Sequence, residues 1–503
     1  MPDFTPSQNK AIETKDVSMV VSAGAGSGKT TVMTSRILRS LLEGSDINRY
    51  LVVTFTKAAA ADVKEKLYKG LMKAQAENPA NRHIAGQLMS LPAADISTVH
   101  AFCFSRIKQY FSVLGITPDV RAADETEANL LLQESMEKVL NEGYEKQQPC
   151  FMLLADGFSG RKSDKRFADV MLGLYKELRV YPNYRRFLEK LIEDLEKDCE
   201  NAEYTNTEVC GVIMDEAKKC ILTARENTEE LCRYVLDVQE EIYLPSLYSF
   251  TEELDTLLSL FSAGYDGVRE YINALKNPRI PQKGHKSEAE KDKIFKLKNN
   301  IFDEIKSIRK RYFLYSSKEN LEDMRTNCAL VKAAKELLFE FDDTYTRAKE
   351  KAGVIDFSDQ EHLMLSLLEK DGAPTPLCLE IKKSFDEIYV DEYQDTNPLQ
   401  DRIFTLLSSD NRFMVGDVKQ SIYRFRSAHP DIFKSYCNTF GKTKNTEKVI
   451  LRENFRCDEN IILFCNKVFS GIKEISDSMN YSEEALIFAK KENLGNNPVK
   501  PMR

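Results

Sequence analysis

Apolar runs alternate with helix-like patterns along the first 120 residues of the chain. Three short runs have the length and composition of buried strands, at residues 19–22, 50–55 and 96–99. Each precedes a stretch with the spacing of an amphipathic helix, at 30–42, at 58–71 and after His100. Such alternation is typical of parallel strands joined by crossover helices, so the pattern predicts an α/β fold.

The pattern then becomes almost purely helical. Residues 124–352 are rich in Glu, Lys and Leu and contain one loop-like stretch at 278–286. Strand-like runs return at 386–390, 412–416 and 448–451. The simplest account is one α/β domain interrupted by a large helical insertion. The predicted limits are 1–123 and 353–445 for the two parts of that domain, 124–352 for the insertion, and 446–503 for the opening of a second α/β domain.

Composition adds a few limits. No apolar run approaches the roughly 20 residues needed to span a bilayer, and the N-terminus lacks a secretory pattern, so we expect a cytoplasmic protein. The eleven cysteines are scattered without a CxxC pair, which argues against a zinc or iron–sulfur site. A net charge of −8 excludes a uniformly basic nucleic-acid coat. Residues 276–312 hold twelve Lys/Arg against five Asp/Glu; a solvated helix face is favoured over a nucleic-acid patch, and both remain open.

A glycine-rich turn between the first predicted strand and helix has the composition of a phosphate-binding loop. Glycines at three alternate positions allow close approach of the backbone to phosphate oxygens, and the following helix N-terminus favours negative charge. Lys29 would neutralise the β- and γ-phosphates, and the Thr30 hydroxyl would bind Mg²⁺. A chance glycine turn is the alternative, and Ala23 stands where the usual pattern has glycine. The candidate nucleotide-binding residues are Ala23, Gly24, Ala25, Gly26, Ser27, Gly28, Lys29, Thr30 and Thr31.

An acidic pair follows a later apolar strand, at the edge of the sheet where ligands bind in open α/β folds. Asp391 would hold Mg²⁺ together with Thr30, and Glu392 would orient or deprotonate the attacking water. An isolated acidic pair after a strand is usually a polar loop. The extension through residue 400, DEYQDTNPLQ, makes that alternative unattractive. Both sites predict an ATP- and Mg²⁺-dependent hydrolase.

Six stretches, spread through a resemblance that runs from about residue 3 to 470, resemble the ordered motifs of the superfamily 1A DNA helicases, the group that includes UvrD, Rep, PcrA and RecB. In chain order, motifs Q, Ia, Ib, II, III and IV are matched by residues 4–8, 53–59, 97–103, 391–395, 415–426 and 451–456. The resemblance implies a P-loop NTPase with a RecA-like parallel sheet, a helical insertion and the beginning of a second RecA-like domain.

The resemblance also implies roles for individual residues. Gln8 would contact adenine, Gln420 would sense the γ-phosphate, and Arg456 would reach that phosphate from the second motor domain. Stacking of bases on aromatic rings suits a sliding single strand, although Tyr423 and Phe425 at a spacing of two fit ordinary core packing of a strand equally well. The implied DNA-binding residues are Phe55, Thr56, Lys57, His100, Tyr423, Phe425 and Arg426.

The IDFSD string at 355–359 and the long insertion look like the AddA branch, the helicase–exonuclease subunits of bacterial AddAB recombination complexes. This resemblance implies 3′-to-5′ DNA unwinding in double-strand-break repair, with DNA and a nuclease subunit of the AddB type as partners. A UvrD-like monomeric helicase and a non-catalytic nucleotide-binding scaffold are the alternatives. The family's later motifs and nuclease domain are not among the 503 residues, so we expect this chain to bind nucleotide without unwinding or cutting DNA. We also expect exposure at 461–464 and disorder after about 470.

Overall fold

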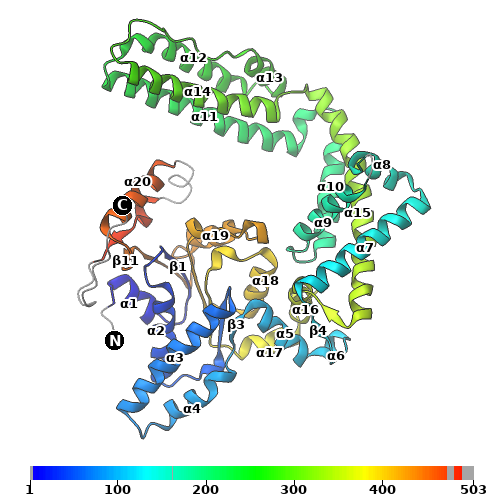
Figure 1. Ribbon diagram of the computed structural model, residues 1–503, viewed down its shortest axis with the longest axis vertical. Coiled ribbons are helices and arrows are strands. Elements are labelled where there is room, and N and C mark those ends of the chain that lie inside the picture. Colours follow the sequence, from blue (N-terminus) through cyan, green and yellow to red (C-terminus); the bar gives the residue numbers. More distant parts are fainter. Residues whose placement is uncertain (1–3, 161–162, 473–480, 490–503) are drawn as a thin grey trace. The chain divides into compact units, whose positions relative to one another are not determined.

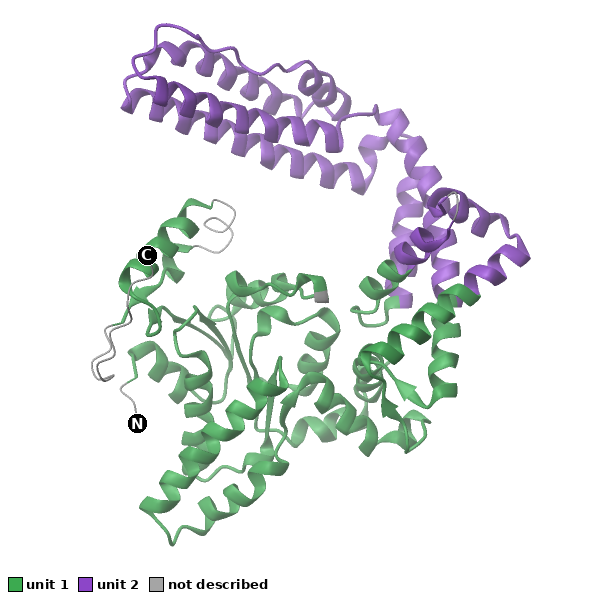
Figure 2. Ribbon diagram, in the orientation of Figure 1, with its two compact units in different colours: residues 1–138, 172–184, 341–503 green, residues 139–171, 185–340 purple. Residues whose placement is uncertain are grey.

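The computed structural model describes residues 4–160, 163–472 and 481–489. The chain forms two compact units (Figure 2). One contains residues 1–138, 172–184 and 341–503, and the other contains residues 139–171 and 185–340.

The first unit is built on a six-stranded parallel sheet with the order β10-β1-β9-β8-β2-β3 (Figure 1). The six strands are near-continuous apolar runs, as expected where both faces of a parallel sheet are covered. All six strands predicted from the sequence are present, with ends that differ by one or two residues. Their bounds are β1 (Ser18–Ala23), β2 (Tyr50–Thr54), β3 (Ile96–Thr98), β8 (Glu387–Val390), β9 (Arg412–Gly416) and β10 (Thr446–Leu451).

Helices cover both faces of this sheet, and alternate residues of each strand point to opposite faces. Val21 and Val52 belong to the core under one helical layer, whereas Val20 and Val53 belong to the core under the other. The first layer contains α1 (Pro6–Glu13), α2 (Lys29–Leu42), α3 (Lys57–Glu77) and α4 (Arg82–Ser90). The second contains α5 (Val99–Gln109), α16 (Phe357–Leu368), α17 (Pro376–Lys383), α18 (Pro398–Leu407) and α19 (Pro430–Thr439). The expected α/β fold is confirmed.

The long middle of the chain is helical, as predicted. Its helices are α7 (Glu125–Lys146), α8 (Pro149–Phe158), α9 (Lys165–Leu178), α10 (Tyr184–Glu200), α11 (Glu208–Asp237), α12 (Leu244–Leu260), α13 (Tyr265–Ala274), α14 (Glu288–Tyr312) and α15 (Ser317–Ala352). The second unit has its own hydrophobic core, formed largely by α11 to α14. In the basic segment, Ile294, Ile301 and Ile305 of α14 face that core.

Residues after 445 extend the first unit. β10 pairs in parallel with β1, so it lies in the same sheet as the phosphate loop. Beyond it, β11 (Glu453–Asn454) pairs with β12 (Ile487–Phe488), and α20 (Glu459–Gly471) lies between them in the sequence. Assignment of 446–503 to a second motor domain stays a prediction. Among the described residues, none of the helices is long and apolar enough to cross a membrane.

The apolar string at 461–464 is exposed as expected, with Phe464 68% and Leu463 59% accessible. The expectation of disorder after 470 was wrong for residues 481–489. Tyr481 is only 2% exposed, and α22 (Tyr481–Glu484) is docked against the sheet through buried polar contacts of Glu484. Residues 473–480 and 490–503 lie outside the described part of the chain.

Candidate nucleotide-binding site

The phosphate loop joins the buried strand β1 to α2, and two of its glycines adopt backbone angles that L side chains rarely adopt. Gly26 has φ of +73° and Gly28 has φ of +84°. A Cβ atom added to Gly26 would lie 2.8 Å from the Cβ of Arg456, so a side chain has no room there. Ser27 Oγ donates to the Gly24 carbonyl at 2.8 Å and tightens the turn. The loop therefore presents its backbone at the N-terminus of α2, where anions bind favourably.

Gln8 is held against this loop. It belongs to a capping box with Thr5 at the start of α1, and its Nε2 donates to the Ser27 carbonyl at 3.0 Å. The side chain is 5% exposed. Its position beside the phosphate loop is compatible with the adenine contact implied by the resemblance, which stays a prediction.

The acidic pair lies at the same edge of the sheet as the phosphate loop. β8 ends at Val390, and the Lys29 ammonium contacts the Glu392 carboxylate at 3.0 Å, although the two residues are 363 positions apart in the sequence. Glu392 adopts a left-handed backbone with φ of +52°, a strained conformation that clusters at functional sites. The two stretches that the sequence singled out therefore share one site.

Asp391 is a buried carboxylate suited to a hard cation. Burial, and then the charge of Glu392, raise the pKa of Asp391 to about 6. Its carboxylate also accepts the Glu392 backbone N–H at 3.0 Å. Mg²⁺ prefers oxygen ligands, and the Asp391 carboxylate with the Thr30 hydroxyl offers them at the edge of the sheet where β1 and β8 end. The residues present fit the metal that the sequence implied.

A buried glutamine connects the acidic pair to the next strand. Gln394 Nε2 donates to Glu392 Oε2 at 2.9 Å, and its Oε1 accepts the backbone N–H of Asp417 at 3.0 Å. The residue is 1% exposed, and a Cβ on Gly416 would lie 2.5 Å from its Oε1. Asp417 in turn accepts a 2.7 Å hydrogen bond from Gln420 Nε2 through Oδ2. Sequence reasoning gave Gln394 and Asp417 no role, and their only signal was membership of the motif strings.

Residues after β10 also touch the phosphate loop. Asn454 Nδ2 donates to the Ala25 carbonyl at 2.6 Å, and the Phe455 N–H donates to the Gly26 carbonyl at 3.0 Å. Asn454 Oδ1 accepts the Arg456 backbone N–H at 2.8 Å. These contacts bring the Arg456 backbone to the loop, near where the resemblance implied its guanidinium would act. Asn454 was missed, since nothing in the sequence distinguishes it from other motif residues.

The candidate DNA-binding residues lie in two groups. The Phe55 ring packs on Tyr423 with centroids 4.6 Å apart, and Tyr423 is 5.8 Å from Phe425. These last two belong to a turn that includes a 3-10 helix (Arg424–Arg426) rather than to a strand, and Phe425 is 77% exposed, so core packing does not explain it. Thr56 is the N-cap of α3, directly before Lys57. The side chain of Arg426 lies outside the described part of the structure.

His100 lines a cavity of about 550 Å³ together with Phe55, Phe357 and Glu361. His100 Nε2 lies 3.1 Å from Glu361, and its ring packs on Phe357 at 4.9 Å. The buried Glu361 carboxylate also accepts hydrogen bonds from the side chains at both ends of the capping box of α18, at 3.2 Å from Asn397 and 2.6 Å from Gln400. Because this box follows the acidic motif directly, Glu361 joins that motif to His100.

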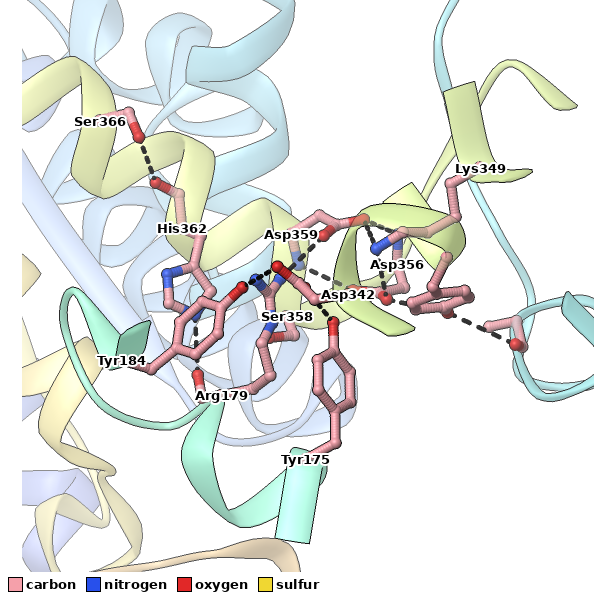
Figure 3. A network of polar contacts seen from close by, with 12 residues as sticks. Tyr175, Arg179, Tyr184, Asp342, Lys349, Asp356, Ser358, Asp359, His362 and Ser366 are labelled. Carbon is pink, nitrogen blue, oxygen red and sulfur yellow. Dashed lines mark hydrogen bonds and ion pairs between the residues drawn. The ribbon is translucent and has the colours of Figure 1, made fainter. Parts of the chain in front are cut away.

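A network of charged residues forms the wall of this cavity (Figure 3). Arg179 donates to Asp359 at 2.8 Å and to Ser358 at 3.0 Å. Lys349 contacts both Asp356 and Asp359. The IDFSD string that marked a family branch in the sequence therefore supplies carboxylates that fix the start of α16. Sequence reasoning could not find Arg179 or Lys349, because their partners are distant in the chain.

A phosphate loop after β1 and an acidic pair after β8 of a parallel sheet define a P-loop nucleotide-binding protein. Within that class, the model of the UvrD/REP helicase N-terminal domain matches residues 4–441, and the chain belongs to this helicase family.

Among curated proteins, the chain is similar to a protein of Clostridium kluyveri that is named for its place in an ATP-dependent helicase/nuclease, with 33% identity over 96% of the chain. It is 30% identical over 99% of its length to the protein of the same name from Clostridioides difficile. The chain spans about 40% of the length of these relatives.

Proposed function

We propose that the chain binds ATP with Mg²⁺ and forms the nucleotide-binding part of a DNA helicase–exonuclease subunit. The 3.0 Å contact of Lys29 with Glu392 carries this proposal, because it joins the phosphate loop to the acidic motif across 363 residues. The names and family of the relatives support the helicase part. By the same resemblance we propose 3′-to-5′ unwinding in double-strand-break repair, in the bacterial cytoplasm, with an AddB-type partner.

The residues suggest a sequence of events at the ATP site. Thr30 and Asp391 would hold Mg²⁺, which would neutralise phosphate charge. Lys29 would exchange its contact with Glu392 for the β- and γ-phosphates, and this exchange would release the Glu392 carboxylate to orient or deprotonate a water. Gln394 keeps a hydrogen bond to Glu392 and would fix its direction during that exchange. Gln8 would contact the adenine, and Arg456 would approach the γ-phosphate from the other side.

Single-stranded DNA would occupy the surface near Phe55, Tyr423 and Phe425. An exposed aromatic beside a stacked aromatic pair supports base stacking, which contributes roughly 1–3 kcal/mol per base and tolerates any sequence. Thr56, Lys57, His100 and Arg426 would supply phosphate and sugar contacts. We propose that residues 1–123 and 353–445 form the first motor domain, 124–352 its insertion and 446–503 the opening of a second motor domain.

The nucleotide site can be tested on this chain with a fluorescent ATP analogue and Mg²⁺. Lys29→Ala should weaken binding about tenfold to a hundredfold, as expected for loss of a charge-assisted phosphate contact. Lys10→Ala is the matched control, because the ion pair of Lys10 with Glu447 is partly exposed at both residues. Equal affinity in wild type and the Lys29 variant would refute the proposed site.

Hydrolysis separates a motor from a non-catalytic lobe. We expect this chain to bind nucleotide with little turnover, and addition of a single-stranded oligonucleotide should not produce unwinding of a duplex. Strong DNA-stimulated hydrolysis by this chain would show that further motor residues are not needed, and it would contradict that part of the proposal.

A further inference from the structure

The segment at 481–489 inserts a buried acid beside the ATP site. Glu484 is 7% exposed. Its Oε1 accepts a hydrogen bond from Ser22 Oγ at 2.9 Å, at the end of β1, and its Oε2 contacts Lys419 Nζ at 2.6 Å. A carboxylate is rarely buried to this extent unless it is paired. The polar partners therefore define where this segment sits.

Lys419 lies between two carboxylates. Its Nζ is 2.9 Å from Asp417 Oδ1 as well as 2.6 Å from Glu484, and all three side chains are less than 10% exposed. Burial acts to lower the pKa of Lys419, but the charges of Asp417 and Glu484 outweigh it and raise that pKa. The ammonium thus stays charged, and the Asp417 carboxylate keeps its counter-charge only while Lys419 is held in place.

Asp417 passes this constraint to Gln420. While Oδ1 faces Lys419, Oδ2 accepts the 2.7 Å hydrogen bond from Gln420 Nε2. Gln420 is the residue for which the resemblance implied contact with the γ-phosphate. A continuous series of polar contacts therefore runs from Glu484 through Lys419 and Asp417 to Gln420.

The same segment lies on the phosphate loop. β12 pairs with β11, whose Asn454 contacts the loop. A Cβ on Gly24 would lie 2.4 Å from the Leu486 side chain. Seating of residues 481–489 therefore determines both the cover of the loop and the ion pair with Lys419.

From these contacts we infer that Glu484 is a positioning residue for Gln420, so that docking of residues 481–489 sets how well the site distinguishes ATP from ADP. This inference rests on the proposed nucleotide-binding function. Glu484 touches no phosphate in this arrangement. Its charge orients Lys419, Lys419 orients Asp417, and Asp417 presents the Gln420 amide toward the position of a γ-phosphate.

The test measures affinities of this chain for ADP and for a non-hydrolysable ATP analogue, each with Mg²⁺. Glu484→Gln keeps the size of the side chain and removes its charge. We expect ADP affinity to be unchanged and affinity for the ATP analogue to fall about threefold to tenfold, the range for misplacing one hydrogen bond. Glu483→Gln is the matched control, because Glu483 is an exposed neighbour on the same helix, and it should change neither affinity.

Dependence on Gln420 distinguishes positioning from general support. Gln420→Ala should itself lower affinity for the ATP analogue, and Glu484→Gln should then have no further effect in that background. Lys419→Met removes the other end of the ion pair and should reproduce the Glu484→Gln result.

An unchanged ratio of the two affinities in variants that still bind ADP would overturn the inference. So would loss of ADP binding in both the Glu484 and Lys419 variants, because the pair would then support the whole site. Absence of any nucleotide binding by the wild type would instead count against the proposed function.

Discussion

Gln394 illustrates how single residues connect the parts of this site. Its amide nitrogen donates to Glu392 while its amide oxygen accepts from the backbone of Asp417, so both ends of one side chain are used. A glutamate at this position would place a second carboxylate against Glu392, and an alanine would leave a buried backbone donor without its partner, which costs about 1–3 kcal/mol. The chemistry of the site therefore requires an amide here.

His362 gives a pH dependence of stability. Burial, and then the charge of Arg179, lower the pKa of His362 to about 4, and its Nε2 lies 2.8 Å from the Arg179 carbonyl. An unfolded chain binds a proton on this histidine below about pH 6.5, whereas the folded chain does not until about pH 4. Stability is therefore fully present above pH 6.5 and is lost as the pH falls from 6.5 toward 4.

We expect the His362 contribution to the free energy of unfolding to fall by roughly 2 kcal/mol between pH 7 and pH 5. His362→Gln retains a donor for the Arg179 carbonyl and cannot titrate. The difference between the two unfolding free energies, measured by urea denaturation at each pH, should shrink by that amount as the pH falls. Parallel curves for the two proteins would mean that His362 is protonated in the folded state.

The sequence anticipated the residues of the ATP site that belong to contiguous strings, such as Lys29, Glu392 and Arg456. The string fixes which atoms a backbone turn can present, so the chemistry can be read from it. Glu484, by contrast, carries no signal, because it is one of many acids in a polar tail. Its partner Lys419 is 65 residues away, and only folding shows that both are buried. Pairs of this kind require the tertiary structure.

At the scale of elements, α16 is fixed at its N-terminus by paired charges. Asp356 and Asp359 form its capping box, and each also contacts Lys349, whose side chain is 4% exposed (Figure 3). Arg179 supplies a second cation to Asp359. The cap satisfies backbone donors, and the cations offset the cost of burying two carboxylates.

Lys349→Met should therefore destabilise the chain by about 3–5 kcal/mol, because it leaves two buried carboxylates with one cation. The measurement is the free energy of unfolding from chemical denaturation. Adding Asp359→Asn to this variant should recover part of the loss by removing one of the charges. Lys69→Met is the control, since the Lys69–Glu65 pair is 71% and 59% exposed and should contribute less than about 1 kcal/mol. Equal effects of the two lysine variants would contradict this view of the network.

Among the elements, the parallel strands were predictable because both of their faces are buried, which produces apolar runs such as 50–54 that local composition reveals. The turn at 424–426 was not, since alternating aromatic and basic residues fit a strand equally well. α22 and β12 have only four and two residues, and their place depends on Glu484 and on pairing with β11. Elements this short are decided by tertiary contacts rather than by periodicity.

At the scale of the whole molecule, each compact unit buries its own hydrophobic core. Phe250 of α12 is 2% exposed in the core of the helical unit, and Phe404 of α18 is fully buried in the unit that holds the sheet. Every residue of the nucleotide site belongs to the latter unit. Ligand binding should therefore stabilise one core directly and leave the other with its own intrinsic stability.

This division predicts two thermal transitions, of which nucleotide shifts one. At a concentration of 100 times its Kd, an ATP analogue with Mg²⁺ should stabilise the sheet unit by about 2.7 kcal/mol and raise only that transition in calorimetry. Phe250→Ala should cost the helical unit about 3–5 kcal/mol and lower the transition that nucleotide does not move, with nucleotide affinity retained. Phe404→Ala, a matched truncation in the other core, should lower the nucleotide-sensitive transition instead. If either variant lowered both transitions equally, the two cores would unfold as one cooperative body, and the insertion would be an integral part of the motor's stability.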